Sequence, residues 1–427
     1  MIIAVSVLFF TLLVLGVPIG FTIGLAGLAG LYFINMDLAF FSMAPLQYFS
    51  GLDMFTLLAM PFFILAGEIM NRTGITGRLV QFANILVGHL RGGLAHANIL
   101  ASVFFAGMTG AAVSDTAAIG TMLIPAMEKD GYDRDFAAAV TASSSIIGPT
   151  IPPSNMMVIY GSLMNVSIAG LFAAGFLPGI LLAGLLMIIA AIFSVKRGYP
   201  KSKRSSLKEM LIGFRNALIP LFMPVIILGG ILSGIFTPTE AAAVAVAYAA
   251  VIGFLVLKSL SLKDIPAMLI KTSRITGVVF LIIGTASILS WVLSFSQVPQ
   301  KIAALMLSVT DNPKLILLMI LGLMVAVGLF MDIAAALIIL GPILHPIAVS
   351  MGIEPIHFGI IMVLSLNIAL MTPPVGACLF VACSIADLKL SQLSRAILPF
   401  IIVEIIALFI VAYVPWFSLF LPRLLGF

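Results

Sequence analysis

The sequence predicts an all-α, multi-pass membrane protein built from two repeats, and three observations lead to this prediction. Of the 427 residues, 62% are hydrophobic and only 9% are charged, too few charges for a soluble protein of this size. Roughly ten to twelve apolar runs follow one another, each long enough to cross ~30 Å of hydrocarbon, and they do not alternate as barrel strands do. Finally, landmark residues of the first half return in the second.

One segment divides the chain near its middle. Residues 196–215 carry seven of the 21 basic residues and a single acid, Glu209. Short basic loops stay in the cytoplasm, so we expect a cytoplasmic linker between a first repeat (residues 1–195) and a second repeat (residues 216–427). The first apolar stretch has no basic residue before it and no small-residue cleavage site, so we interpret it as a retained span.

Six residues recur at fixed spacings, with one four-residue shift between the two sets. The residue pairs 217 apart are Gly67 and Gly284, Asp115 and Asp332, and Pro125 and Pro342; those 221 apart are Pro152 and Pro373, Pro153 and Pro374, and Pro178 and Pro399. Internal repeats of this kind mark secondary transporters. No basic residue precedes Asn35, which suggests an outside N-terminus. With a cytoplasmic linker, the first half then crosses the membrane an odd number of times, which favours inverted repeats.

Each half contains two unusual elements. The first is a re-entrant helical hairpin, expected at about 97–127 and again at about 314–345, with a polar, glycine-rich turn between arms too short to span. The second is a discontinuous helix, expected at about 135–164 and again at about 356–384, which glycine and prolines interrupt midway.

A helix broken inside a membrane exposes carbonyls at one new end and N–H groups at the other. Each unsatisfied group costs several kcal/mol in lipid, so the break must be buried or must line a wet cavity. Carbonyl oxygens suit a small cation such as sodium, and helix N-termini suit a carboxylate. A plain proline kink is the alternative, but one proline suffices for a kink, whereas 147–155 combines three prolines with nearby hydroxyls.

Two intramembrane carboxylates, Asp115 and Asp332, occupy matching repeat positions. Each could bind an ion or substrate, or could cap a half-helix, and both roles could hold at once. Glu68 is interpreted as a structural partner near a helix end. No phosphate-binding loop, catalytic triad or zinc-protease motif occurs, so we expect a transporter and not an enzyme.

Several segments, in order, resemble the large membrane (M) subunit of tripartite ATP-independent periplasmic (TRAP) transporters. They are GMTGAAVSDTAAIGTMLIPAM, GPTIPPSN, FTPTEAAAVA, GLFMDIAAALIILGPIL and TPPVG. The resemblance covers essentially the whole chain. It implies a sodium-driven, elevator-type importer of organic acids, such as C4-dicarboxylates or sialic acid, in the bacterial inner membrane.

The resemblance also implies partners and sites. The partners are a small four-helix membrane subunit (Q type), expected as a separate polypeptide, and a periplasmic substrate-binding protein (P type). The implied substrate-binding residues are Ser114, Asp115, Thr116, Ser154, Asn155, Asp332 and Thr372. Two or more sodium ions would be held by Thr109, Gly110, Gly148, Thr150, Ile151 and Pro153 in the first half, and by Gly328, Asp332, Thr372, Pro374 and Gly376 in the second.

Two other functions stay open at this point. A stand-alone sodium- or proton-coupled anion transporter or antiporter would share the hairpins and broken helices but would need no binding protein. A membrane enzyme would show converging acids, histidines or metal ligands, and a channel would need no mobile hairpins.

Overall fold

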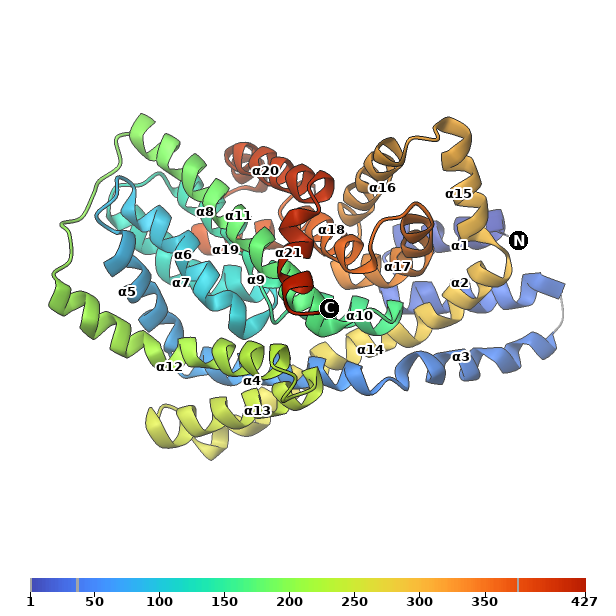
Figure 1. Ribbon diagram of the computed structural model, residues 1–427, viewed down its shortest axis with the longest axis horizontal. Coiled ribbons are helices and arrows are strands. Elements are labelled where there is room, and N and C mark those ends of the chain that lie inside the picture. Colours follow the sequence, from blue (N-terminus) through green and yellow to red (C-terminus); the bar gives the residue numbers. More distant parts are fainter. Residues whose placement is uncertain (1, 36–37, 375) are drawn as a thin grey trace.

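The computed structural model describes residues 2–35, 38–374 and 376–427, and every regular element in these ranges is helical (Figure 1). The first half contains α1 (Ile2–Val14), α2 (Ile19–Asn35), α3 (Met43–Leu52), α4 (Ala59–Arg72), α5 (Ile75–Val87), α6 (Gly93–Thr109), α7 (Ala112–Lys129), α8 (Arg134–Ser144), α9 (Ile147–Thr150), α10 (Asn155–Met164) and α11 (Ile168–Lys196). The second half contains α12 (Leu207–Leu232), α13 (Pro238–Ala250), α14 (Ile265–Phe295), α15 (Val298–Val309), α16 (Pro313–Gly328), α17 (Ile333–Ser350), α18 (Pro355–Ala369), α19 (Ala377–Ala386), α20 (Leu390–Tyr413) and α21 (Trp416–Leu424). Short helical turns are η1 (Leu38–Ser42), η2 (Phe55–Leu58), η3 (Val251–Val256) and η4 (Leu262–Asp264).

In the described ranges, seven helical segments are long and apolar enough to cross a membrane, among them α11, α12, α14 and α20. The other apolar runs of the sequence form shorter helices, because turns divide them. Large apolar side chains on the outer helices, such as Val14 and Leu211, are exposed, as lipid surroundings allow. The protein is therefore an all-α, multi-pass membrane protein, as the composition predicts.

The same order of elements occurs in both halves. Two peripheral helices come first (α1–α2, then α12–α13). A long helical segment follows, which is divided into α3 and α4 in the first half and is continuous as α14 in the second. A helical hairpin follows (α6–α7, then α16–α17), then an interrupted helix (α8–α10, then α18–α19), then a long helix (α11, then α20). The division into repeats and their inverted relation stay predictions.

The linker is shorter than the basic segment 196–215, because α12 already begins at Leu207. A capping box starts this helix: the Ser206 N–H donates to Glu209 Oε2 (2.7 Å), and the Glu209 N–H donates to Ser206 Oγ (3.2 Å). Residues 197–206 connect α11 to α12 outside regular helix.

The two interrupted helices lie at the centre of the molecule. In α8 every residue from Phe136 to Ser144 is buried, and in α18 so is every residue from His357 to Ala369. Helices buried on all sides must satisfy their polar groups internally. In the first half, Asn98 Nδ2 of α6 donates to Thr141 Oγ1 of α8 at 2.7 Å.

Each hairpin packs on the interrupted helix of the other half as well as on its own. Helix α7 contacts α19, and α17 contacts α10. The second contact includes a 2.6 Å hydrogen bond between Tyr160 Oη and His345 Nδ1. These contacts between the halves bring both hairpin tips to the middle of the molecule, against α4 and α14 (Figure 1).

Candidate functional site

The first interrupted helix is broken by a short extended segment. Helix α9 ends at Thr150, residues 151–154 leave the helix, and α10 begins at Asn155. Ser154 is the N-cap of α10, and its Oγ accepts from the Met157 N–H at 3.5 Å. The whole break is buried, so its backbone groups face protein or a cavity and not lipid.

The tip of the first hairpin lies directly on this break. Gly110 joins α6 to α7 with φ +58°, and a Cβ added to it would lie 2.8 Å from the Pro153 carbonyl oxygen. Asp115, one turn into α7, lies against Gly148: a Cβ there would come within 2.0 Å of Asp115 Oδ2. The structure thus brings together four of the predicted residues. The side chain of a fifth, Thr109, lies outside what the structure describes.

Two predicted sodium ligands, Thr150 and Ile151, contact other helices. Thr150 Oγ1 donates to the Ile146 carbonyl (2.8 Å) and accepts from Asn367 Nδ2 of α18 (3.3 Å). The Ile151 side chain packs against Gly179 of α11, where a Cβ would lie 2.2 Å from Ile151 Cγ1. Asn367, which the sequence did not single out, therefore links the two halves at the break.

The tip of the second hairpin lies at the end of α18. Gly328 ends α16, and a Cβ on it would come within 2.5 Å of Ala369 Cβ. Asp332 is the N-cap of α17, and its Oδ1 accepts from the Ala334 N–H at 2.9 Å, so the capping role is confirmed for this aspartate. Asp115 differs, because the N-cap of α7 is Ala111.

The second break folds back on itself. Thr372 Oγ1 donates to the Ile368 carbonyl (2.8 Å), and the Gly376 N–H donates to the Thr372 carbonyl (3.3 Å). Pro374 is exposed, and Val375 lies outside the described residues. Three of the predicted second-half ligands, Thr372, Pro374 and Gly376, therefore lie after the end of α18, whereas Gly328 and Asp332 lie on the hairpin tip.

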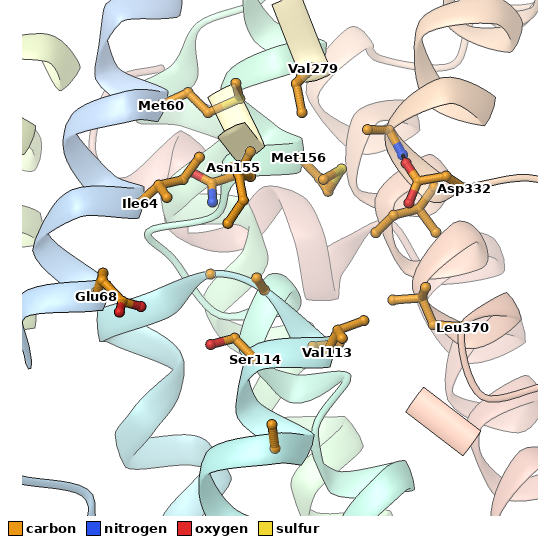
Figure 2. Close-up of a pocket in the computed structure, with 18 of the residues that line it drawn as sticks. Met60, Ile64, Glu68, Val113, Ser114, Asn155, Met156, Val279, Asp332 and Leu370 are labelled. Atoms are coloured by element: carbon orange, nitrogen blue, oxygen red, sulfur yellow. Dashed lines mark hydrogen bonds between the residues drawn. The ribbon is translucent and has the colours of Figure 1, made fainter. Parts of the chain in front are cut away.

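A cavity of about 470 Å³ lies where the two tips meet α4 and α14, and we name it the central cavity. Three of the predicted substrate residues line it, each at the start of a different helix: Ser114 on α7, Asn155 on α10 and Asp332 on α17. Figure 2 shows these side chains around one hollow, with Glu68 of α4 on the side away from Asp332. Asp115, Thr116 and Ser154 are completely buried behind this lining.

The charged groups of the central cavity come from both halves. Lys271 Nζ of α14 lies 2.6 Å from Glu68 Oε2, and Arg72 Nε lies 3.0 Å from Glu68 Oε1. The Asn71 amide donates to Ser114 Oγ at 3.4 Å. Glu68 is thus a structural partner at the end of α4, as expected, but it also lines the cavity. Lys271 is not among the residues predicted for the substrate, yet it lines this cavity.

This arrangement favours an anion. Three helix N-termini present N–H groups and the positive ends of their dipoles to the same hollow. Of the two carboxylates in the wall, Glu68 is offset by Lys271 and Arg72, and Asp332 caps α17. Asn155 and Ser114 add polar side chains, and apolar residues such as Met60 and Ile159 form the rest of the wall. A small organic acid has the size and chemistry that such a cavity accepts.

Comparisons with known proteins point to one group. A sequence model described as "Tripartite ATP-independent periplasmic transporter, DctM component" matches residues 6–417. The chain is 42% identical over 413 residues to the sialic acid TRAP transporter large permease protein SiaM of Vibrio cholerae, covering 97% of this chain and 96% of that protein. It is 41% identical over 381 residues to the C4-dicarboxylate TRAP transporter large permease protein DctM of Pseudomonas aeruginosa, covering 89% of each. The fold is also similar to the solved Alcanivorax borkumensis YdaH transporter, with a TM-score of 0.63 at 13% identity over 91% of this chain and 90% of that chain.

Proposed function

The chain belongs to the DctM component family of tripartite ATP-independent periplasmic transporters, and we propose that it is the large membrane subunit of a sodium-coupled organic-acid importer. The observation that supports this most directly is the central cavity, where three helix N-termini and Lys271 surround one hollow. The relatives' names indicate carboxylate substrates, sialic acid and C4-dicarboxylates.

In this proposal the substrate carboxylate binds in the central cavity between Lys271 and the N-termini of α7, α10 and α17. Glu68 holds the ammonium group of Lys271 in place before substrate arrives. An incoming carboxylate then competes with Glu68 for Lys271, while Arg72 continues to neutralise Glu68. Hydrogen bonds from Asn155 and Ser114 would orient the rest of the molecule.

The coupling ions in this proposal are sodium ions held at the two contacts between tip and break. Hard cations prefer carbonyl and carboxylate oxygens. The first contact offers the Pro153 carbonyl beside Gly110 and the Asp115 carboxylate beside Gly148. The second offers the turn 372–376 and the carboxylate of Asp332. Sodium at these positions would connect each tip to its break and so complete the wall of the central cavity.

Transport would follow an elevator mechanism, in which both hairpins and both interrupted helices move together relative to the peripheral helices. A small four-helix membrane subunit would extend the fixed part, and a periplasmic binding protein would deliver substrate. The location would be the bacterial inner membrane, with the basic linker in the cytoplasm.

The test is uptake in proteoliposomes that contain this chain, its small subunit and its binding protein, with sodium and pH gradients imposed separately. We expect uptake of sialic acid or succinate that requires an inward sodium gradient, the small subunit and the binding protein. Equal uptake by this chain alone would favour the stand-alone transporter. Uptake driven by the pH gradient in the absence of sodium would show that protons, and not sodium ions, are the coupling ions.

A further inference from the structure

A second cavity, of about 450 Å³, lies between α3, α10, α14 and α17. Polar side chains form much of its wall. They are Gln47 and Ser50 of α3, and Ser287, Ser290 and Ser294 of α14, with Trp291 and His345 beside them. We name this hollow the serine cavity.

The serine cavity lies at the end of the molecule that faces away from the basic linker. Helix α8 starts beside the linker, where Arg197 Nη1 lies 2.7 Å from Asp133 Oδ2. The interrupted helix then runs inward through its break, and α10 ends at Met164 in the wall of the serine cavity. If the linker is cytoplasmic, this wall faces the periplasm.

Three helices line both cavities. Helix α14 lines the central cavity at Lys271 and the serine cavity at Ser290, about 28 Å apart along the helix at 1.5 Å per residue. Helices α10 and α17 also border both. Between the two hollows, Ile282 and Ile283 of α14 are buried, with 2% and 0% of their surfaces exposed. One interface therefore contains two hollows, which buried residues of α14 separate along the helix.

The serine cavity has the chemistry of a wet, uncharged site. Polar side chains in membrane-length helices are costly against lipid, so Gln47 and the serines indicate a hollow filled by water or a polar solute. Ser287 Oγ donates to the Ile283 carbonyl at 2.9 Å, which leaves its lone pairs free to accept. Trp291 adds an aromatic surface with an N–H donor. Among the described residues of this lining there is no lysine or arginine, in contrast to the central cavity.

We propose that the serine cavity is a transit site that binds the hydroxyl- and amide-bearing part of an organic acid on its way to the central cavity. The proposal rests on the proposed function, because it assumes that an organic acid crosses this interface. Hydroxyl and amide groups hold the solute weakly here, and the carboxylate meets its cation only at Lys271. Sialic acid has this chemistry, whereas succinate has two carboxylates and no hydroxyl.

The test is the reactivity of a cysteine at Ser290 in spheroplasts that express the complete transporter. A membrane-impermeant methanethiosulfonate is added outside, and modification is followed with and without sialic acid or succinate. The matched control is Val278→Cys, on the same helix and 59% exposed but outside both cavity walls. The two native cysteines are buried, so the unsubstituted chain gives the background.

We expect Ser290→Cys to react about tenfold faster than Val278→Cys, because only a water-exposed thiol forms the reactive thiolate. Sialic acid should slow this reaction about threefold or more, and succinate should not. Modification should also stop uptake. Equal rates at the two positions would show a dry or lipid-filled hollow, and equal effects of the two acids, or none, would overturn the ligand class. Sodium-dependent uptake by the unsubstituted chain tests the proposed function separately.

Discussion

In both halves a glycine lets the hairpin tip approach the interrupted helix closely, but the glycine lies on opposite sides of the two contacts. In the first half the glycine is on the interrupted helix: Gly148 receives the Asp115 carboxylate from the tip. At the matching position of the second half, 221 residues later, stands Ala369. There the glycine is on the tip, where Gly328 receives the Ala369 methyl group.

The two contacts also differ in burial. In the first tip, Gly110, Asp115 and Thr116 are buried. In the second, Gly328 and Ala369 are also buried where they meet, but the rest of the tip is open, because Asp332 is exposed and Phe330 is 63% exposed. A close contact in a dry interior cannot relax, whereas a tip that borders a hollow can shift. We therefore expect a glycine-to-alanine change at the contact to reduce transport severely in the first half and mildly in the second.

The largest effect is expected for Gly148→Ala. Its methyl group would have to lie 2.0 Å from Asp115 Oδ2, so the carboxylate must leave its position or the tip must separate from the break. Overpacking of this kind costs about 1–3 kcal/mol, and we expect sodium-dependent uptake to fall about 100-fold or more. The measurement is initial uptake in proteoliposomes at equal reconstituted protein.

The control for Gly148→Ala is Gly229→Ala in α12, where an added Cβ meets nothing within 4 Å. This variant should transport at the wild-type rate. If Gly148→Ala also transported normally, the first contact would not be as rigid as its burial indicates.

The second effect concerns the charges that the halves contribute to the central cavity, Glu68 from the first and Lys271 from the second. Lys271→Met should raise the KM for the organic acid about 10-fold or more, because the cavity loses the cation nearest the substrate while Arg72 still neutralises Glu68. The measurement is substrate dependence of uptake at saturating sodium. Lys271→Arg should retain most of the affinity; an unchanged KM in Lys271→Met would place the carboxylate elsewhere.

A smaller effect is expected for Gly328→Ala, although its methyl group would lie 2.5 Å from Ala369 Cβ. Gly328 and Ala369 are buried, but Phe330 and Asp332 beside them are exposed, so the tip can shift to make room and we expect uptake to fall only about threefold. The double variant Gly328→Ala, Ala369→Gly moves the glycine to the side that it occupies in the first half, and it should restore uptake. Loss as severe as that of Gly148→Ala would remove the proposed difference between the halves.

The sequence predicted the features that depend on local backbone chemistry. The proline pairs 152–153 and 373–374, which recur 221 residues apart, lie in the breaks after α9 and α18, and Gly110 and Gly328 lie where α6 and α16 end. Ser114, Asn155 and Asp332, predicted for the substrate, do line one cavity. These predictions were possible because a glycine permits the left-handed backbone that ends α6 at Gly110, and because proline pairs cannot continue a helix wherever the chain folds.

The residues that the sequence missed depend on tertiary packing. Lys271 has Met54 at the matching repeat position, and Asn367 has Ile146, so neither stands out as a repeat. Lys271 enters the cavity only because α14 crosses α4, which pairs it with Glu68. No local sequence pattern predicts that α14 crosses α4. A pair such as Lys271 and Glu68, with one residue from each half, can therefore be recognised only in the folded structure.

The smallest effect concerns how each interrupted helix is anchored at its start. The N-cap residues Asp133 of α8 and Glu354 of α18, also 221 residues apart, each pair with an arginine, Arg197 and Arg423. The Tyr199 hydroxyl donates to Asp133 at 2.7 Å, and this bond, with Arg197, holds the pKa of Asp133 below its ordinary value of 3.8. A carboxylate with a depressed pKa stabilises the fold above its unfolded pKa, and that stability is lost as the pH falls through its folded pKa.

We therefore expect Asp133→Asn to lower the free energy of unfolding at pH 7 by less than about 1 kcal/mol, since the Asp133 side chain is 59% exposed and solvent screens the pair. The difference from wild type should begin to shrink as the pH falls below 3.8 and should disappear below the lowered pKa of folded Asp133, where the wild-type carboxyl group is protonated too. Thermal unfolding in detergent at both pH values measures this. Tyr199→Phe should reproduce part of the loss at pH 7, because it removes the hydroxyl that lowers the pKa but keeps the ring packed on Tyr132 and Phe136. A loss in Asp133→Asn that persisted unchanged at low pH would mean that the carboxylate charge does not anchor α8.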